Sequence, residues 1–320
     1  MPRTVLFTLG GAGLLLIAMR LAFCGPLEAG APRPRPPRLG EGASPAALER
    51  DVRYLAESLG PRGQRHPASM RQAANHIARA FAAAGGRVER QPTPVGAPPF
   101  TNVVARFGPA GLPLRVVGAH YDSFRDTAGA DDDASGVAGL LELARLLGAT
   151  HLEAPVELVA YANEEPPHFR TNQMGSAVHA RTVAASARVV VLEMIGYFSS
   201  EPGSQEAPSR ALAGRIPDVG DFVVVVGRSE DEEFARAVRD ALALQGAPPV
   251  YAFTAPPTRP GIDHSDHRSY WPRDIPAVMV TDTAFLRNHA YHTERDTPEA
   301  LDYERMAAVV DGVFVWLTEG

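Results

Sequence analysis

The chain has 320 residues and carries 31 Lys and Arg against 37 Asp and Glu, so its formal net charge is −6 at pH 7. This acidic balance excludes the basic footprint of a nucleic-acid-binding surface, and we expect no nucleic-acid partner. A hydrophobic content of 45% is enough for a globular protein with a packed core. The single cysteine, Cys24, excludes an intramolecular disulfide.

The first thirty residues predict export. An uncharged apolar run of fifteen residues, Val5 to Met19, lies between Arg3 and Arg20, which is the pattern of a signal peptide or a membrane anchor. The run suits a cleavable signal better than a full membrane span, which takes about 20 residues. We therefore expect residues 1–30 to direct the protein out of the cytoplasm, so that it is secreted, periplasmic or tethered to a membrane. A buried N-terminal core helix is the alternative.

A proline-rich segment, residues 31–43, follows and predicts an extended, semi-rigid linker. Ser44 and Pro45 then form a typical helix start, with proline at the first helical position. Neither an internal repeat nor a break in composition occurs after Ser44. We therefore expect one domain over residues 44–320.

Within this domain, short apolar runs alternate with helical patterns. Helices are expected from Ser44, from Ser69 with Gln72 in a capping box, and over 134–147, 174–185, 231–244 and 303–317. Strands are expected at 103–107, 114–120, 156–163, 189–198, 221–227 and 277–285. Because these strands are continuous β-branched runs, both of their faces should be buried. The pattern predicts an α/β fold, a three-layer α/β/α sandwich around a central, mostly parallel mixed sheet. Residues 199–220 should form a long loop.

Residues with metal-binding or acid–base chemistry end, interrupt or follow four of these strands. They are His120, Glu164, Glu165, Glu193 and His292. In open α/β sheets ligands bind beyond the carboxyl ends of the strands, so these side chains should meet at one edge of the sheet. The loop from Gly118 to Gly136 adds five aspartates to the same edge.

Taken singly, each acid has an ordinary explanation, because acids at strand ends are often solvated or cap the next helix. Together they form a set of nitrogen and oxygen donors without cysteine, which suits Zn²⁺, with Co²⁺ or Mn²⁺ as substitutes. Two histidines with three or more carboxylates exceed the needs of one tetrahedral ion. The surplus predicts two metals about 3.5–4 Å apart that share a bridging carboxylate.

The ordered motifs GAHYDS, GADDDASG, ANEE, LEMIG and YHTERDTPE resemble the zinc aminopeptidase family of clan MH, which includes di-zinc leucyl aminopeptidases, aminopeptidase Y and glutamate carboxypeptidase. The resemblance covers the chain from Leu48 to the C-terminus. It implies a phosphorylase/hydrolase-like zinc peptidase fold for residues 44–320. It also implies a hydrolase that acts on peptides, in the first place an aminopeptidase.

The resemblance assigns the metal ligands by position. It makes Asp131 the ligand that bridges two Zn²⁺ ions, with His120 and Glu193 completing one site. Glu165 and His292 complete the other. The resemblance further implies a cis peptide bond after Asp131.

The resemblance also assigns the groups that carry the reaction. Glu164 becomes the general base, which takes a proton from a water that bridges the metals. Tyr291 matches a tyrosine that hydrogen-bonds the oxyanion in some members. Asp122 lies two residues beyond His120 on the same side of a strand, so it should accept the other imidazole N–H and fix the tautomer.

Further polar residues are expected to support this set. Asp266 and His267, in the sequence HSDH, should lie behind the ligands or in the wall of the site. Asp132 and Asp133 should hold their loop and cap the helix that follows. Glu193 stands where many members of the family have aspartate, so its longer side chain needs a different approach to the metal.

Two other functions stay open. A glutaminyl cyclase shares this fold but holds a single zinc, and His120 counts against it because a one-metal site has no use for the extra imidazole. A non-catalytic, receptor-like ectodomain on the same scaffold is the second. Such proteins tend to lose ligands, and none is missing in this sequence.

The sequence leaves open which end of a peptide is recognised. The stretch Pro166 to Ser176 is longer than the short glycine-rich turn of small aminopeptidases, so no substrate pocket carries over from them. Its His168 is more simply a surface or gate histidine than a ligand. The arginines near the candidate walls are Arg170, Arg268, Arg273 and Arg287.

Overall fold

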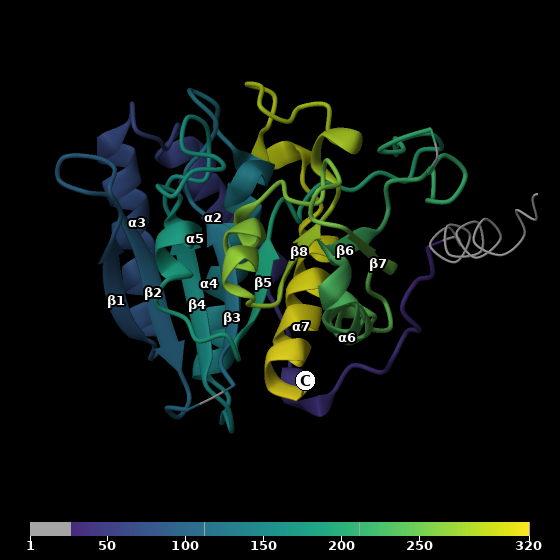
Figure 1. The fold of residues 1–320 in the computed structure, drawn as a ribbon, viewed down its shortest axis with the longest axis horizontal. Helices are drawn as coiled ribbons and strands as arrows, with labels where there is room; N and C mark the ends of the chain where they lie inside the picture. Colours follow the sequence, from purple (N-terminus) through teal and green to yellow (C-terminus); the bar gives the residue numbers. More distant parts are fainter. Residues whose placement is uncertain (1–26, 112, 211, 320) are drawn as a thin grey trace, which may run out of the picture.

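The computed structural model describes residues 27–111, 113–210 and 212–319 (Figure 1). In these residues eight strands form one sheet in the order β1-β2-β4-β3-β5-β8-β6-β7. The strands are β1 (Arg87–Pro92), β2 (Thr101–Phe107), β3 (Arg115–His120), β4 (Val156–Tyr161), β5 (Arg188–Leu192), β6 (Val223–Arg228), β7 (Val250–Ala255) and β8 (Ala277–Thr281). The central strands β4, β3, β5 and β8 are parallel to one another, and β6 is parallel to β7. The pairs β1–β2, β2–β4 and β6–β8 are antiparallel.

The helices of the described residues differ widely in length. The α-helices are α2 (Pro45–Arg53), α3 (Pro67–Ala83), α4 (Gly136–Gly148), α5 (Gly175–His179), α6 (Glu232–Leu242) and α7 (Tyr303–Glu319). Shorter helical turns are η1 (Pro37–Leu39), η2 (Tyr54–Ser58), η3 (Ala130–Ser135), η4 (Ser229–Asp231), η5 (Asp266–Ser269), η6 (Trp271–Arg273), η7 (Ala284–Leu286) and η8 (Pro298–Ala300). The Asp302 carboxylate accepts the N–H of Arg305 and so caps the start of α7.

The sheet separates two apolar cores. Helices α2, α3, α4, α6 and α7 lie on one side of it, whereas α5, η5 and η6 cover the other side. Neighbouring strand residues serve different cores: Val117 and Val190 belong to the first, and Val116 and Val189 to the second. Both faces of the central strands are therefore buried, as their apolar runs predicted. The expected three-layer α/β/α sandwich with a mixed sheet is confirmed.

Two details of the sequence interpretation are wrong. The second helix begins at Pro67 and not at Ser69, whose hydroxyl donates to the carbonyl of Leu59 instead of capping a helix. The edge strands β1 and β7 were not predicted. β1 has the polar sequence RVERQP and is largely exposed, so it lacks the apolar run on which the other strands were recognised.

The proline-rich segment packs against the body of the domain. Gly30 N–H donates to Val250 O on the edge strand β7, and Arg33 N–H donates to Ala243 O. The side chain of Arg35 pairs with Asp311 on α7. The packed body therefore extends to the N-terminal side of Ser44, along an extended segment of the kind that the prolines predicted.

The apolar run from Val5 to Met19 lies outside the described residues. Within residues 27–111, 113–210 and 212–319, none of the helices has the length and apolar character needed to cross a bilayer.

Candidate metal centre

Two groups of three side chains lie beyond the carboxyl ends of the parallel strands. The first group is His120, Asp132 and Glu193, and the second is Asp132, Glu165 and His292. In each group the candidate ligand atoms lie within 4.8 Å of one another. Asp132 belongs to both groups.

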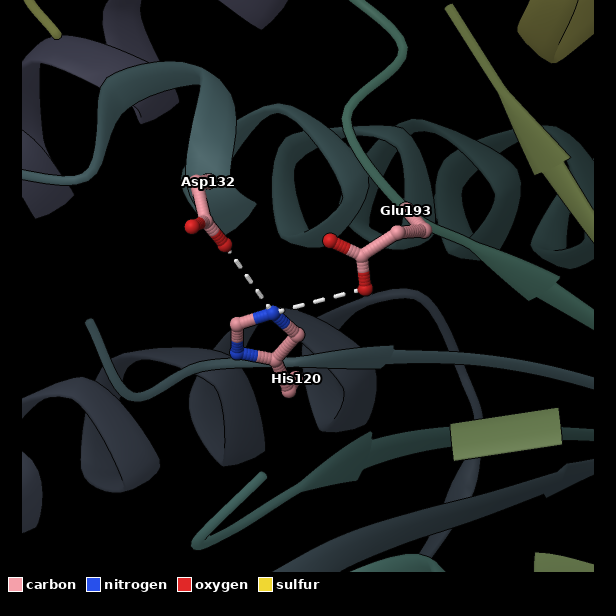
Figure 2. Close-up of side chains that lie close together, drawn as sticks. All are labelled: His120, Asp132 and Glu193. Atoms are coloured by element: carbon pink, nitrogen blue, oxygen red, sulfur yellow. Dashed lines mark ion pairs between the residues drawn. The ribbon is translucent and has the colours of Figure 1, made fainter. Parts of the chain in front are cut away.

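The distances within the groups place Asp132 between the two histidines. His120 Nε2 lies 3.2 Å from Asp132 Oδ1 and 3.6 Å from Glu193 Oε2 (Figure 2). His292 Nε2 lies 3.1 Å from Asp132 Oδ2 and 3.4 Å from Glu165 Oε1. Each oxygen of Asp132 thus faces a different imidazole, which is the arrangement expected of a carboxylate that bridges two cations.

The bridging position predicted for Asp131 is occupied by Asp132, so that prediction is wrong by one residue. The carboxylate of Asp131 is turned away from both groups, because it accepts the N–H of Gly196 at 3.1 Å and the side-chain amide of Asn288 at 2.9 Å. The cis peptide bond likewise lies one residue later than predicted, between Asp132 and Asp133. Within η3 these two residues depart from helical backbone angles, and three identical side chains in a row could not reveal where the chain turns.

The backbone around Asp132 is fixed by two other carboxylates. Asp296 accepts the N–H of Asp131 at 2.8 Å and that of Asp132 at 3.1 Å. Asp133 accepts the N–H of Gly136 at 3.0 Å, so this residue caps α4 as predicted. Asp296 was not predicted, although it lies four residues after His292 in the same motif.

A buried arginine holds the loop that precedes η3. The side chain of Arg62 is fully buried and donates to backbone carbonyls on three separate segments. These carbonyls belong to Leu55, Gly60, Tyr121, Ala128 and Gly129. Burial lowers the pKa of Arg62 to about 10, although nearby aspartates oppose that shift. Its chemistry offered no sequence signal, because a buried arginine cannot be told from a surface one by its neighbours in the chain.

Asp122 positions the two consecutive glutamates. Its two carboxylate oxygens accept the N–H groups of Glu164 and Glu165, each at 3.0 Å. The closest acceptor for Nδ1 of His120 is the backbone carbonyl of Asp122 at 3.1 Å, and the Asp122 carboxylate lies at 3.5 Å. Since a carbonyl can only accept, Nδ1 donates to it, which leaves Nε2, on the side of Asp132 and Glu193, as the nitrogen that can coordinate a cation.

The two groups contain buried polar atoms that no protein group satisfies. His120 Nε2, His292 Nε2 and Glu165 Oε1 are buried without a hydrogen-bond partner. Buried polar atoms are nearly always paired, so three such atoms at one place indicate a missing partner. Imidazole nitrogen and carboxylate oxygen are donors that suit zinc. The residues therefore fit divalent cations.

The charge balance points the same way. Burial lowers the pKa of His120, but the charge of Glu193 and the contacts with Asp122 and Asp132 outweigh burial and raise it well above its usual value. Burial also lowers the pKa of His292, and its contacts with Asp132 and Glu165 raise it to about 9. The site thus stabilises positive charge at both imidazoles, which metal ions would supply in place of protons.

Glu164 and Tyr291 border the two groups. Burial raises the pKa of Glu164 well above its ordinary value, which favours a carboxylate able to take up a proton near neutral pH. The ring of Tyr291 stacks on that of His292 with centroids 3.7 Å apart. Burial, together with the neighbouring acids, raises the pKa of Tyr291, so its hydroxyl keeps its proton and can donate.

Residues of the HSDH sequence, 264–267, contact Glu193 and contribute to the wall of the site. Ser265 donates its hydroxyl to Glu193 Oε2 at 2.6 Å, a contact that was not predicted. Burial raises the pKa of Asp266 to about 7. His267 donates from Nε2 to the carbonyl of Ile262 at 2.7 Å, and burial lowers its pKa to about 4. His267 is thus a neutral wall residue.

An apolar cavity of about 520 Å³ opens beside Glu193 and Tyr291. Its walls come from β6, β7 and β8, from described residues between Gln205 and Ile216, and from the segments 259–264 and 283–291. The large apolar residues on the sheet side are Phe222, Val224, Val226, Phe253, Ile262 and Met279. Such a cavity suits a bulky apolar group held next to the metal groups.

Most of the polar residues that the sequence singled out near the walls have structural partners. Both nitrogens of His168 lie within hydrogen-bond distance of glutamine side chains, so this residue is not a ligand. Arg287 is buried and donates to Gln205 and to the carbonyl of Phe222. Arg273 is exposed. Arg170 and Arg268 both pair with Asp263.

The comparisons with known proteins agree with this geometry. The uncharacterized protein YfbL of Escherichia coli strain K12 is 48% identical over 284 residues, which cover 86% of this chain and 88% of YfbL. BSAP, a zinc aminopeptidase from Bacillus subtilis, has a TM-score of 0.65 at 16% identity, over 89% of this chain and 95% of BSAP. Porphyromonas gingivalis glutaminyl cyclase has a TM-score of 0.64 at 20% identity, over 86% and 98% of the two chains. These two structures share the fold. The model of peptidase family M28 matches residues 102–317, and the chain therefore belongs to this metallopeptidase family.

Proposed function

We propose that the protein is a co-catalytic di-zinc aminopeptidase that removes N-terminal residues from peptides. The observation that carries the proposal is the carboxylate of Asp132, whose two oxygens face His120 and His292 at 3.2 and 3.1 Å. A single ion would need only one of these imidazoles together with its carboxylates. Two imidazoles on opposite sides of one carboxylate support a pair of ions.

The chain's own residues divide the work between them. His120, Glu193 and Asp132 would hold one ion, and Glu165, His292 and Asp132 the other. When bound, the ions supply Lewis acidity toward the scissile carbonyl and toward water. Glu164 accepts the proton of the attacking water and returns it to the departing amine.

The surroundings of these groups orient the peptide. Tyr291 donates its hydroxyl to the oxyanion as the tetrahedral intermediate forms. The apolar cavity beside Glu193 and Tyr291 receives the side chain of the first residue.

The test uses the purified full chain loaded with Zn²⁺ and a panel of aminoacyl-p-nitroanilides. We expect release of nitroaniline, with the highest kcat/KM for bulky apolar residues, loss of activity to a chelator and recovery on adding Zn²⁺. Co²⁺ or Mn²⁺ should restore part of the activity. A folded chain fully loaded with Zn²⁺ that hydrolyses none of these substrates would contradict the proposal.

Glutaminyl cyclase is the second candidate, because the P. gingivalis cyclase shares the fold over 86% of this chain. The two candidates differ in metal content. Two zinc ions per chain support the aminopeptidase, whereas one ion and release of ammonia from an N-terminal glutaminyl peptide would support the cyclase.

We also propose that residues 1–30 export the protein, on the sequence evidence of the apolar run from Val5 to Met19. Fractionation of cells that express the full chain tests this. Recovery outside the cytoplasm is expected, and retention in the cytoplasm would exclude it.

A further inference from the structure

Two arginines, Arg170 and Arg268, share a single carboxylate. Arg170 Nη2 lies 2.7 Å from Asp263 Oδ1, and Arg268 Nε lies 3.3 Å from Asp263 Oδ2. The carboxylate side chain is only 16% exposed, whereas the side chains of Arg170 and Arg268 are 46% and 26% exposed. One arginine would neutralise Asp263. The pair therefore leaves one positive charge, on guanidinium groups that solvent can reach.

The chain ties each arginine to a different metal group. Arg170 follows Glu165 by two tight turns, in which His168 N–H donates to Glu165 O and Thr171 N–H donates to His168 O. Arg268 N–H donates to Ser265 O, and the hydroxyl of Ser265 holds Glu193 of the first group. The turns after Glu165 and the turn after Ser265 therefore bring the two guanidinium groups to the same place, at the carboxylate of Asp263.

Aromatic rings connect this place to the apolar cavity. The Arg170 and Arg268 guanidinium carbons lie 5.3 and 5.9 Å from the ring centroid of Phe169. The ring of Phe169 is 6.4 Å from that of His264, which in turn is 6.3 Å from Phe285. Both His264 and Phe285 line the cavity beside Glu193.

Electrostatics place the arginines within reach of the same cavity wall. Partial burial lowers the pKa of His264, and the charges of Arg170 and Arg268 lower it further, whereas Asp263 and Glu193 oppose the shift. The arginines and Glu193 therefore act with opposite signs on one imidazole of the cavity wall.

We propose that Arg170 and Arg268 form a subsite for the C-terminal carboxylate of a peptide, so that peptides with a free C-terminus are preferred over their C-terminal amides. This inference rests on the proposed peptidase function. The arginine pair can accept a carboxylate because guanidinium groups bind carboxylates in a planar, two-point manner.

The test compares Leu-Leu with its C-terminal amide, Leu-Leu-NH₂, on the zinc-loaded full chain. We expect the free acid to have the higher kcat/KM, by about 10-fold or more, as a charge-assisted hydrogen bond gives. In Arg268→Ala and Arg170→Ala, KM for the acid rises far more than KM for the amide, so the ratio of acid to amide falls toward one. Arg268→Lys restores part of the ratio because it restores the charge. Arg273→Ala, an exposed arginine on η6 in the same segment, keeps the ratio of the parent chain.

Three results would overturn the subsite. One is equal turnover of acid and amide by the parent chain. Another is an equal loss for both substrates in Arg268→Ala, which would make the arginine a structural clamp for Asp263. The third is a ratio of acid to amide turnover that falls in Arg125→Ala and stays unchanged in Arg268→Ala. Arg125 lies over the ring of Phe124, 4.8 Å from the ring centroid.

The subsite can be tested even if the peptidase proposal fails. If the loaded chain hydrolyses neither substrate, calorimetric titration of Leu-Leu and Leu-Leu-NH₂ into the parent chain and Arg268→Ala still measures the preference. Tighter binding of the acid that is lost in Arg268→Ala supports the subsite, and equal binding of the two overturns it.

Discussion

Two clusters of ionisable side chains in the described part of the chain differ in one respect. One is the metal centre, and the other is a polar chain on the α5 side of the sheet, which consists of Arg106, Glu157, Tyr161, His179 and Tyr270. In the polar chain, His179 Nε2 lies 2.8 Å from Glu157 Oε1 and Nδ1 lies 2.7 Å from the hydroxyl of Tyr270. Tyr270 in turn lies 2.6 Å from the hydroxyl of Tyr161, and Arg106 pairs with the second oxygen of Glu157 at 2.7 Å. Both nitrogens of this buried histidine are therefore used.

The metal centre shows the opposite pattern. In both His120 and His292, the Nε2 atom is buried without a hydrogen-bond partner. Its carboxylates also outnumber its cationic side chains, whereas Glu157 has Arg106 beside it. Burial and charge are common to both clusters, so neither marks a ligand site by itself. The buried atoms without a partner are what distinguish the centre that needs ions from the cluster that is complete.

Replacing the shared carboxylate should break the metal centre most severely. In Asp132→Asn one of the two oxygens that face His120 and His292 is lost together with the charge. We expect metal affinity at both groups to fall by more than the ~100-fold that loss of a supporting contact costs, and activity to disappear. Elemental analysis after dialysis should find less than one ion per chain.

The matched control is Asp131→Asn, whose side chain points at Gly196 and Asn288. It should retain two ions per chain, with an effect confined to stability. Loss of metal from this variant and not from Asp132→Asn would restore the assignment that the motif alone suggested.

Asp131 and Asp132 show which features of the site could be predicted from the sequence and which could not. The apolar runs of the sequence do not reveal the order of the strands in the sheet. The β-branched composition of these runs was nevertheless enough to predict the layered fold. The polar residues at the carboxyl ends of the strands were enough to place His120, Glu165, Glu193 and His292 at one edge of the sheet. Those residues lie in well-separated motifs, so each could be located without knowing the backbone. The choice among three consecutive aspartates depends on φ and ψ within η3, which identical neighbours do not encode.

The supporting contacts escaped prediction for a different reason. Ser265 reaches Glu193 across 72 positions and Asp296 reaches Asp132 across 164. Neither pair leaves a pattern in a single sequence, because contacts of this kind depend on how distant segments pack. Arg62 is the same case, since its carbonyl acceptors come from three segments brought together only by the fold.

Substituting the general base should separate chemistry from metal binding within the centre. Glu164→Gln keeps the shape of the side chain but cannot accept a proton. We expect kcat to fall by about 10²–10⁴-fold, while the metal content and the unfolding temperature stay those of the parent chain. Turnover within a few fold of the parent would contradict the role of Glu164.

The polar chain should respond in stability and leave the metal centre intact. Burial raises the pKa of Glu157, but the contacts with His179 and Arg106 outweigh it and hold the pKa below its ordinary value. We expect Glu157→Gln to cost about 3 kcal/mol of unfolding free energy at pH 7, the low end for a broken buried pair because Arg106 is partly exposed and screened. The measurement is urea denaturation of the metal-free chain, and two ions should still bind the folded variant.

The pH dependence of this effect has a definite sign. A carboxyl whose pKa is lowered by folding stabilises the fold above its unfolded pKa, about 4.3 for glutamate, and the contribution disappears as the pH falls through the lower folded pKa. The difference between Glu157→Gln and the parent chain should therefore be largest near neutral pH and shrink below about pH 4. A difference that grows toward low pH would show that the contacts of Glu157 do not favour its ionised form.

The smallest expected effect tests whether the two halves of the metal centre can be separated. Ser265 is buried and donates to Glu193, which belongs to the first group alone. Ser265→Ala removes a supporting contact and should weaken the ion held by His120 and Glu193 by about 10–100-fold, while the ion at Glu165 and His292 stays. Ser269→Ala is the control, because that hydroxyl pairs with Ser176 instead of with a carboxylate. Stepwise chelation should then remove one ion early from Ser265→Ala and neither early from Ser269→Ala. Simultaneous loss of both ions would mean that Asp132 couples the two groups so tightly that they act as one site.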